Sequence, residues 1–375
     1  MRLVYLVNSL GIGGAERHLL NLTCDMVSRG YSVWVVVLRR EVRGGASSLD
    51  HEFSSAGAEV VFLRDFGLAD FGLWLSLISL LKRLRPNILH SHLPRADLAA
   101  SIAKVVLPTM HWVSTIHDTY TKDKYSGYWI FPLVGWNWRR ADQLVAVSRR
   151  VQAWSVCEFS MPPNKTRVIY HGVPVYEVFD FLPAKSKTFP IIGCLARFEK
   201  RKGLETLIKA MSEVVREFPS AQLLLAGSDP AGYSSVIKHL IKALNLEGNV
   251  KVLGFCSTPL EFLHDLDVFA FASTSEGFGI VLIEAMSVKR SIVASDIYPI
   301  NHIVQHGKSG LLVCPGDHQA FASAISELLR KPQMRHEMGE SGYWRCIEEF
   351  SLEQALNRVH DLYLELTSAT CLRGG

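Results

Sequence analysis

The chain has no apolar run long enough to cross a bilayer. Its longest apolar stretch, Leu73 to Leu81, is well short of the roughly 20 residues that a membrane-spanning helix requires. Residues 2–7 are apolar, but a loop follows at once and no small-residue cleavage site is present, so we expect a first strand there and not a signal peptide. We therefore expect a cytoplasmic protein, with the inner face of the cytoplasmic membrane as its expected site of any peripheral contact.

The cysteines also show no paired spacing in the sequence. The seven cysteines are scattered, odd in number and include no C-x-x-C pair. This pattern is not that of a disulfide framework or a zinc ribbon, and it indicates small core residues in a reducing compartment.

Neither positive nor negative charge dominates the chain. Charged residues make up 20% of the chain and the net charge is +4 over 375 residues, a composition that does not indicate a disordered chain or a dedicated nucleic-acid binder. Residues 1–170 hold 20 Lys and Arg against 13 Asp and Glu, and the remainder holds 20 against 23. The basic first half is consistent with an anionic lipid or phosphorylated acceptor, and equally with scattered surface charge.

Short apolar runs alternate with amphipathic stretches, and the alternation occurs twice. Such alternation predicts parallel βαβ units with helices on both faces of each sheet, and at this length two doubly wound α/β domains. The predicted strands are Leu3–Val7, Val33–Leu38, Glu59–Leu63, Ile88–His90, Trp112–Ile116 and Gln143–Val147, then Ile191–Leu195, Leu223–Ala226, Val250–Leu253, Val268–Ala272, Ser291–Ala294 and Gly310–Val313.

The weakly patterned, proline-bearing residues 172–190 separate the two sets of strands and are the predicted linker. The expected organisation is therefore a first domain over 1–171, a second over 191–350, and a terminal helix and tail over 351–375. Ser351 is the predicted N-cap of that helix. Ligands of doubly wound sheets bind at the carboxyl ends of the strands, so the residues just after each strand are the candidates for chemistry.

Two candidates follow strands of the first domain. Gly11, Gly13 and Gly14 lie between the first strand and the first helix, but the third glycine of a dinucleotide fingerprint is missing. This loop is either an anion site at a helix N-terminus or only a tight turn. His117 follows the strand Trp112–Ile116. A histidine with an ordinary pKa can gain or lose a proton near neutral pH, so His117 is a candidate for catalysis, although a lone histidine is often structural.

A cationic loop follows the first strand of the second domain. Arg197, Lys200, Arg201 and Lys202 are four cations within six residues, just before a predicted helix. Arginine and lysine side chains neutralise a diphosphate well, so we favour a phosphate site over an ordinary solvated loop.

Two glutamates separated by seven residues form the strongest local signal. Glu276 lies in the loop after the strand Val268–Ala272, and Glu284 lies in the apolar helix that follows. Between them, Gly277, Phe278 and Gly279 place a flexible backbone at the helix N-terminus, which can bind phosphate. A favourable first-turn charge explains Glu276 alone, but it does not explain a carboxylate at Glu284 among apolar neighbours.

The full set of motifs resembles the family 4 retaining glycosyltransferases of GT-B architecture, also known as glycosyl transferases group 1. The resemblance covers nearly the whole chain and implies two Rossmann-like domains facing across a cleft, with the terminal helix crossing back to the first domain. The motifs that carry it are Gly13-Gly14-Ala15-Glu16, His117-Asp118, Ala146-Val147-Ser148, residues 168–173, Arg197 with Lys202-Gly203, Leu225-Ala226-Gly227, Glu276 with Glu284, and residues 310–313.

The resemblance also implies roles for the candidate residues. The donor would be a nucleotide sugar, acting as a substrate and not as a resident cofactor, with a UDP-sugar favoured over a GDP-sugar. Arg197 and Lys202 would grip its pyrophosphate, Glu284 the ribose and Glu276 the sugar. The remaining implied contacts are the backbone at Gly277, Phe278 and Gly279, the base-pocket segment Gly254 and Phe255, and, from the first domain, Gly13, Gly14 and the sugar-orienting His117.

The sequence departs from the family pattern at four places. Lys289-Arg290-Ser291 replaces a usual Gly-x-Pro, Ile297-Tyr298-Pro299 a glycine pair, His302 an acidic residue and His171 a frequent asparagine. The resemblance implies front-face transfer with retained anomeric configuration, with cations neutralising the departing diphosphate. Since no Asp-x-Asp follows a predicted strand, we expect no essential metal.

The acceptor is less well defined by the sequence: a glycan, a lipid-linked or a small-molecule hydroxyl all fit, and cell-surface polysaccharide or glycolipid synthesis is the expected setting. Aromatic and basic residues in 128–140 and in 73–85 predict either contact with an anionic membrane or ordinary helix packing. Two rival functions remain, a nucleotide-sugar epimerase and a non-catalytic nucleotide-binding module. A dehydrogenase is disfavoured because Arg39-Arg40, and no acidic residue, follow the second strand. The oligomeric state is left open.

Overall fold

The computed structural model describes residues 1–11, 13–38, 49–63, 71–121, 131–175 and 189–371, and the chain divides into two units. Unit 1 comprises Met1–His171 and Gln354–Gly375, and unit 2 comprises Gly172–Glu353. Each unit has one parallel α/β sheet of its own, as the alternating pattern of apolar runs predicts. Most of the predicted linker, residues 176–188, and Arg39-Arg40 lie outside the described residues.

Unit 1 contains a seven-stranded sheet in the order β3-β2-β1-β4-β5-β6-β7, in which every strand pair is parallel. The chain builds outward from β1 to β3, returns to β4 beside β1, and then builds outward on the other side. The strands are β1 (Arg2–Val7), β2 (Ser32–Val37), β3 (Glu59–Phe62), β4 (Ile88–His92), β5 (His111–Ile116), β6 (Gln143–Ala146) and β7 (Thr166–Val168).

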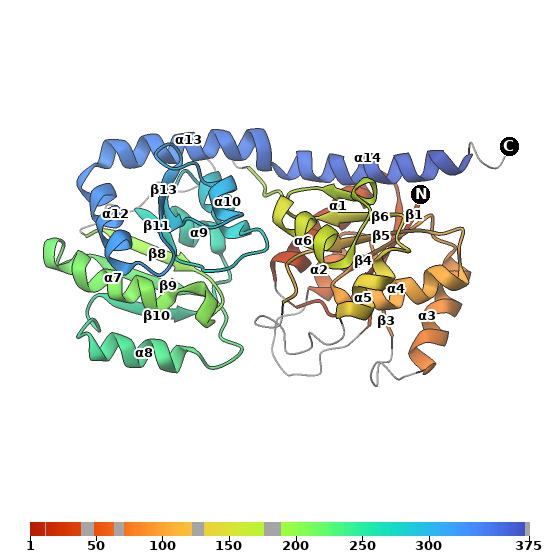
Figure 1. The fold of residues 1–375 in the computed structure, drawn as a ribbon, viewed down its shortest axis with the longest axis horizontal. Helices are drawn as coiled ribbons and strands as arrows, with labels where there is room; N and C mark the ends of the chain where they lie inside the picture. The colour runs from red at the N-terminus through yellow and green to blue at the C-terminus, as the bar shows by residue number, and fades with distance from the viewer. Residues whose placement is uncertain (12, 39–48, 64–70, 122–130, 176–188, 372–375) are drawn as a thin grey trace. The chain divides into compact units, whose positions relative to one another are not determined.

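Helices connect these strands, and the last helix of the chain belongs to this unit as well (Figure 1). The Tyr363 hydroxyl lies 2.5 Å from His90 Nδ1 on β4, and Arg167 pairs with Glu365. The expectation that the terminal helix crosses back to the first domain is confirmed. The helices of unit 1 are α1 (Gly14–Ser28), α2 (Asp50–Ser55), α3 (Phe71–Leu84), α4 (Pro94–Val106), α5 (Phe131–Trp138), α6 (Arg149–Phe159) and, from Gln354 onward, α14 (Leu352–Cys371), with a 3₁₀ turn at Pro163–Lys165.

Unit 2 contains a six-stranded parallel sheet in the order β10-β9-β8-β11-β12-β13. Its strands are β8 (Ile191–Leu195), β9 (Gln222–Ala226), β10 (Val250–Gly254), β11 (Val268–Phe271), β12 (Ser291–Ser295) and β13 (Gly310–Val313). Its helices are the 3₁₀ turn η4 (Lys200–Lys202), α7 (Leu204–Glu217), α8 (Ser234–Ala243), α9 (Pro259–His264), α10 (Ile280–Ser287), α11 (Ile300–Ile303), α12 (His318–Arg330) and α13 (Pro332–Phe350).

Burial explains why these segments take these forms. Parallel strands are covered on both faces, so β11 and β12 are buried along their whole length and β1 along all but its first residue. Helix α7 buries Leu207, Met211 and Val214, spaced at one helical turn, against the sheet of unit 2. All twelve predicted strands are present. β7 was not predicted because its three residues, TRV, carry too little apolar pattern.

Candidate active site

The candidate donor residues of unit 2 follow the two strands at which the strand order reverses. Strands β8, β9 and β10 build in one direction and β11, β12 and β13 in the other, so β8 and β11 are neighbours at the switch point. Ligands of open α/β sheets bind outside the carboxyl ends of such strands, because the loops there diverge to opposite faces. The loop with Arg197 and Lys202 follows β8, and the loop with Glu276 follows β11.

Lys202 and Glu276 meet at this switch point. The Lys202 Nζ atom lies 2.5 Å from Glu276 Oε1, and the two residues are 8% and 6% exposed. Lys202 also lies over the ring of Phe271 at 5.6 Å from its centroid. Two residues that the sequence places 74 positions apart therefore form one buried ion pair.

The charge state of this pair follows from its surroundings. Burial alone raises the pKa of Glu276, but the Lys202 charge and hydrogen bonds from Lys202 and Ser273 reverse that effect, and the net pKa is below its ordinary value. Glu276 is thus ionised at neutral pH. The stabilisation from this lowered pKa is present at neutral pH and is lost as the pH falls through the folded-state pKa.

Glycine backbone allows the two loops to approach each other. Gly203 takes φ +67°, and a Cβ at this position would lie 2.0 Å from the carbonyl oxygen of Ala272 at the end of β11. The Thr274 N–H donates to the Arg201 carbonyl at 2.8 Å, which ties the loops together directly. Gly203 enters the sequence-based prediction only within the Lys202-Gly203 motif, without a role of its own. Its place between a cationic turn and a helix is the signal for the close approach seen here.

Arg197 occupies the same loop but a different environment. Its side chain is 55% exposed and pairs with Glu199 Oε1 at 3.1 Å, while Arg201 pairs with Glu199 Oε2 at 2.8 Å. The structure does not bring Arg197 into contact with the Lys202–Glu276 pair. Three cations of this loop pair with two carboxylates, and Lys200 adds a fourth positive charge, so the loop keeps an excess of positive charge that favours an anionic ligand.

The N-terminus of α10 lies in the second of these loops. Gly279 is its N-cap with φ +103°, and no side chain caps the free backbone N–H groups of the first turn. The Phe278 side chain is buried and packs edge-on against Phe350 at 6.0 Å, so the backbone at Gly277 and Phe278 is anchored. Glu284 lies one turn into α10 and is half-buried. An anion placed at such a helix end receives both N–H donors and the positive end of the dipole.

The predicted base-pocket segment ends β10. Gly254 takes φ +77°, and its carbonyl accepts a 2.7 Å hydrogen bond from the N–H of Gly227, the residue after β9. A Cβ at Gly227 would lie 1.8 Å from the Ala196 carbonyl oxygen, so glycine again permits close approach of neighbouring loops. Phe255 is 53% exposed and offers a free aromatic face. Such a ring can stack on a nucleobase.

The glycine loop of unit 1 also lies at a switch point, between β1 and β4. Gly13 is the extended N-cap of α1, and Gly14 is exposed at the first position of that helix. No side chain caps this helix end, and a Cβ at Gly13 would meet the Glu16 carboxylate at 2.4 Å. The free N–H groups of α1 therefore face the carboxyl edge of the sheet.

His117 belongs to a group of five histidines in unit 1, which we call the histidine cluster: His18, His90, His92, His117 and His171. His117 Nε2 lies 3.1 Å from His92 Nδ1, and its ring stacks on His171 with centroids 5.4 Å apart. His171 in turn meets His18 edge-on at 4.4 Å. The sequence alone assigns a role only to His117 and marks His171 as a departure from the family pattern, because nothing in the local sequence shows that the segments with His18, His90 and His92 meet them.

The histidine cluster is held neutral. Burial, and then the charge of His18, lowers the pKa of His117 to about 3, and burial lowers the pKa of His18 to about 4. The pKa values of His90, His92 and His171 are lowered as well, again mainly by burial. At neutral pH His117 is thus an uncharged hydrogen-bonding group, whereas an isolated histidine would exchange protons there.

Two of the departures from the family pattern have structural accounts. Lys289 takes the left-handed conformation, φ +58°, that a glycine adopts readily, and its Nζ pairs with Glu340 on α13 at 2.7 Å. His171 fills its position by stacking within the histidine cluster. Among the described residues, no group of three or more His, Cys, Asp or Glu side chains is arranged to hold a metal ion.

Two family models together match nearly the whole chain. Residues 12–176 match Glycosyltransferase Family 4, and residues 177–345 match Glycosyl transferases group 1. The chain is 26% identical to the N-acetyl-alpha-D-glucosaminyl L-malate synthase of Bacillus anthracis over 306 residues, 79% of each chain. It is 24% identical to the lipopolysaccharide core biosynthesis glycosyltransferase LpsE of Rhizobium meliloti over 371 residues, 95% of this chain and 96% of the relative.

A solved structure shares the fold over the same extent. The crystal structure of Anabaena HepE in complex with UDP-glucose has a TM-score of 0.85 and 20% sequence identity, covering 97% of this chain and 100% of the HepE chain.

The Lys202–Glu276 pair predicts a specific pattern of stability changes. Glu276→Ala leaves a buried cation without its partner, so we expect the unfolding free energy of unit 2 to fall by roughly 3–5 kcal/mol. The double variant Lys202→Met/Glu276→Gln removes both charges and should be less destabilised than Glu276→Ala alone. Urea unfolding of the double variant and of its two parents, Lys202→Met and Glu276→Gln, measures the coupling. A double variant whose loss of unfolding free energy equals the sum of the two single losses would contradict it.

The histidine cluster predicts acid sensitivity of unit 1. A histidine whose folded pKa lies below its unfolded value of about 6.5 costs stability as the pH falls below 6.5, because only the unfolded state takes up the proton; each group contributes up to about 1.4 kcal/mol per pH unit. Asp97, buried and with its pKa raised to about 6, opposes this trend by one group. We expect His171→Asn to flatten the dependence of unfolding free energy on pH between 6.5 and 5, relative to the exposed control His51→Asn on α2 of the same unit. An unchanged slope would contradict the account.

Proposed function

The chain belongs to the family 4 glycosyltransferases of GT-B architecture, and we propose that it is a retaining enzyme that moves a sugar from a nucleotide-sugar donor to an acceptor hydroxyl. The observation that carries the proposal is the Lys202–Glu276 pair at the β8/β11 switch point, within a loop pair rich in cations. The role of LpsE in lipopolysaccharide core biosynthesis supports a role of this chain in cell-surface polysaccharide or glycolipid synthesis. The UDP-glucose bound to HepE supports a UDP-sugar as the donor.

Unit 2 supplies the donor site in this proposal. Arg197 and Lys202 neutralise the diphosphate, and the uncapped N-terminus of α10 donates backbone N–H groups to it. Glu284 accepts the ribose hydroxyls and Glu276 a hydroxyl of the sugar, since ionised carboxylates are strong acceptors. Phe255 stacks on the base, and the glycine backbone at Gly254 and Gly277 to Gly279 leaves room for the ligand.

The chemistry is front-face transfer. Negative charge grows on the leaving diphosphate while positive charge grows on the sugar. The preorganised cations and the helix N-terminus stabilise the charge on the diphosphate, and they do so most strongly in the transition state. The acceptor hydroxyl attacks from the same face and passes its proton toward the departing phosphate oxygen. From unit 1, neutral His117 hydrogen-bonds the transferred sugar or the attacking hydroxyl, and Gly13 and Gly14 face donor and acceptor. The cations take the place of a metal ion.

Two measurements test the proposal directly, the binding of a donor and the effect of removing the Arg197 charge on turnover. In a thermal-shift screen, a nucleotide sugar at 100 times its dissociation constant should add about 2.7 kcal/mol of stability. With that donor and EDTA present, Arg197→Ala should lower kcat for sugar transfer by roughly 10²–10³. Arg216→Ala, which removes an arginine of α7 that is also exposed and paired with a glutamate, should not.

Other outcomes identify the rivals. Release of an isomerised donor without any acceptor identifies an epimerase, and unchanged biological activity of Lys202→Ala and Glu276→Ala identifies a non-catalytic binding module. Complete loss of transfer in EDTA would contradict the metal-independent mechanism.

We further propose peripheral contact of unit 1 with an anionic membrane through α5. Trp136 is 53% exposed, Leu133 is exposed beside it, and the Arg140 guanidinium lies 4.1 Å from the Trp136 ring centroid. Trp138 is instead fully buried, so only one side of this aromatic segment faces solvent. Residues 128–130 of the same segment lie outside the described residues. No helix in the described part of the chain is long and apolar enough to span a membrane.

The membrane proposal predicts a loss of binding from one side of α5. Leu133→Ser/Trp136→Ser should abolish co-sedimentation with phosphatidylglycerol vesicles, because it removes the apolar contacts that partition into the interface. Trp344→Ser, an exposed tryptophan of unit 2, is the matched control. Equal and negligible binding of the wild-type protein to anionic and neutral vesicles would end the proposal.

A further inference from the structure

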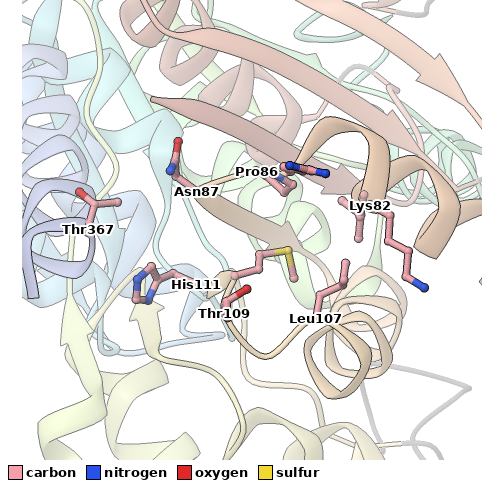
Figure 2. Close-up of a pocket in the computed structure, with 10 residues that line it drawn as sticks. Lys82, Pro86, Asn87, Leu107, Thr109, His111 and Thr367 are labelled. Carbon is pink, nitrogen blue, oxygen red and sulfur yellow. The ribbon is translucent and has the colours of Figure 1, made fainter. Parts of the chain in front are cut away.

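A pocket of about 720 Å³ opens in unit 1 at the edge of the sheet opposite to the candidate site. Its walls come from the segments that lead into β4 and β5, so it lies at the amino ends of these strands. Figure 2 shows Asn87 and Pro86 on one side and Thr109 and Leu107 on the other. Since the candidate active-site residues follow the carboxyl ends of strands, this pocket belongs to a different part of the fold.

The pocket carries positive charge that no described residue neutralises. Lys82 and Arg85 line it, both are exposed, and neither makes an ion pair or a side-chain hydrogen bond within the described part of the chain. None of the described lining residues is acidic. Asp142, the carboxylate nearest His111, is held by Lys104 at 2.7 Å.

The backbone of Arg85 adds an independent observation. Its N–H donates to the Leu81 carbonyl at 2.8 Å, and its φ is +47°, so it ends α3 in the left-handed conformation. Glycine or asparagine is favoured at such a helix end, because most other side chains are strained in the left-handed conformation. No described residue pairs with the Arg85 side chain, so its contacts within the described part of the chain do not account for an arginine here, and a ligand in the pocket would.

Neutral donors and an apolar wall complete the pocket. The Asn87 Oδ1 atom accepts the Arg2 N–H at 2.8 Å, which fixes the amide so that its NH₂ group remains a donor. Leu107 and Met110 supply apolar surface. Exposed Val105 and Val106 at the end of α4 precede this wall.

We propose that this pocket binds a phosphate-bearing anion, with Lys82 and Arg85 contacting the phosphate oxygens and Asn87 donating a hydrogen bond. Arginine and lysine together fit a phosphate group through charge-assisted hydrogen bonds. The phosphate belongs either to a free phosphomonoester or to the headgroup of a phospholipid. The apolar wall would cover the carbon part of either ligand.

The test compares the wild-type protein with Lys82→Gln/Arg85→Gly. Glycine fits the left-handed position, so this variant should melt no lower than the wild-type protein, and Lys82→Gln/Arg85→Asn is a second version that also tolerates it. Arg83→Gln removes a cation from the same helix outside the pocket and is the control. One arm titrates sn-glycerol 3-phosphate by calorimetry, and the other co-sediments phosphatidylglycerol and phosphatidylcholine vesicles.

At least a tenfold loss of glycerol phosphate affinity in the double variant, but not in Arg83→Gln, supports the pocket with a free phosphomonoester. Loss confined to phosphatidylglycerol vesicles supports it with a lipid headgroup. Binding of both probes by the double variant within twofold of wild type, or no binding of either probe by the wild-type protein, overturns the proposal. A UDP-induced thermal shift, unchanged in the double variant, reports separately on the donor site.

Discussion

The strand order of a doubly wound parallel sheet is the constraint on which this structure depends. Where the order reverses, consecutive loops turn to opposite faces of the sheet and leave the ends of two adjacent strands open. In unit 2 these strands are β8 and β11, and their loops deliver Lys202 and Glu276 to a single buried ion pair. A cationic turn and an acidic loop that are distant in sequence become one charged site because of topology.

Close approach of backbone is the second requirement of this site. Gly203 and Gly227 lie where a Cβ would overlap a carbonyl oxygen of the neighbouring loop, at 2.0 and 1.8 Å respectively. Gly279 serves as the N-cap of α10 without a side-chain cap, which leaves the helix N-terminus open to a ligand. The glycines therefore both join the loops and keep their donors accessible, two properties that a side chain would remove.

Unit 1 buries a cluster of neutral histidines, whereas unit 2 buries an ion pair. Its histidine cluster places five imidazoles around the end of β4, and burial keeps them uncharged. Neutral imidazoles hydrogen-bond without the cost of a buried charge. In the proposed reaction, His117 would therefore orient a hydroxyl without adding positive charge beside the sugar. The price of this arrangement is sensitivity to acid, which follows from the same burial.

The sequence by itself determined the strands, the two α/β units and the cationic and acidic motifs. Apolar runs buried on both faces leave a strong local pattern, whereas β7 is too short to leave one. Only the tertiary structure decided which motifs meet. It paired Lys202 with Glu276, turned Arg197 toward Glu199, and assembled the histidine cluster from residues that lie up to 153 positions apart, from His18 to His171. Side-chain contacts and pKa shifts depend on burial and on neighbours from distant segments, and neither quantity is written in the local sequence.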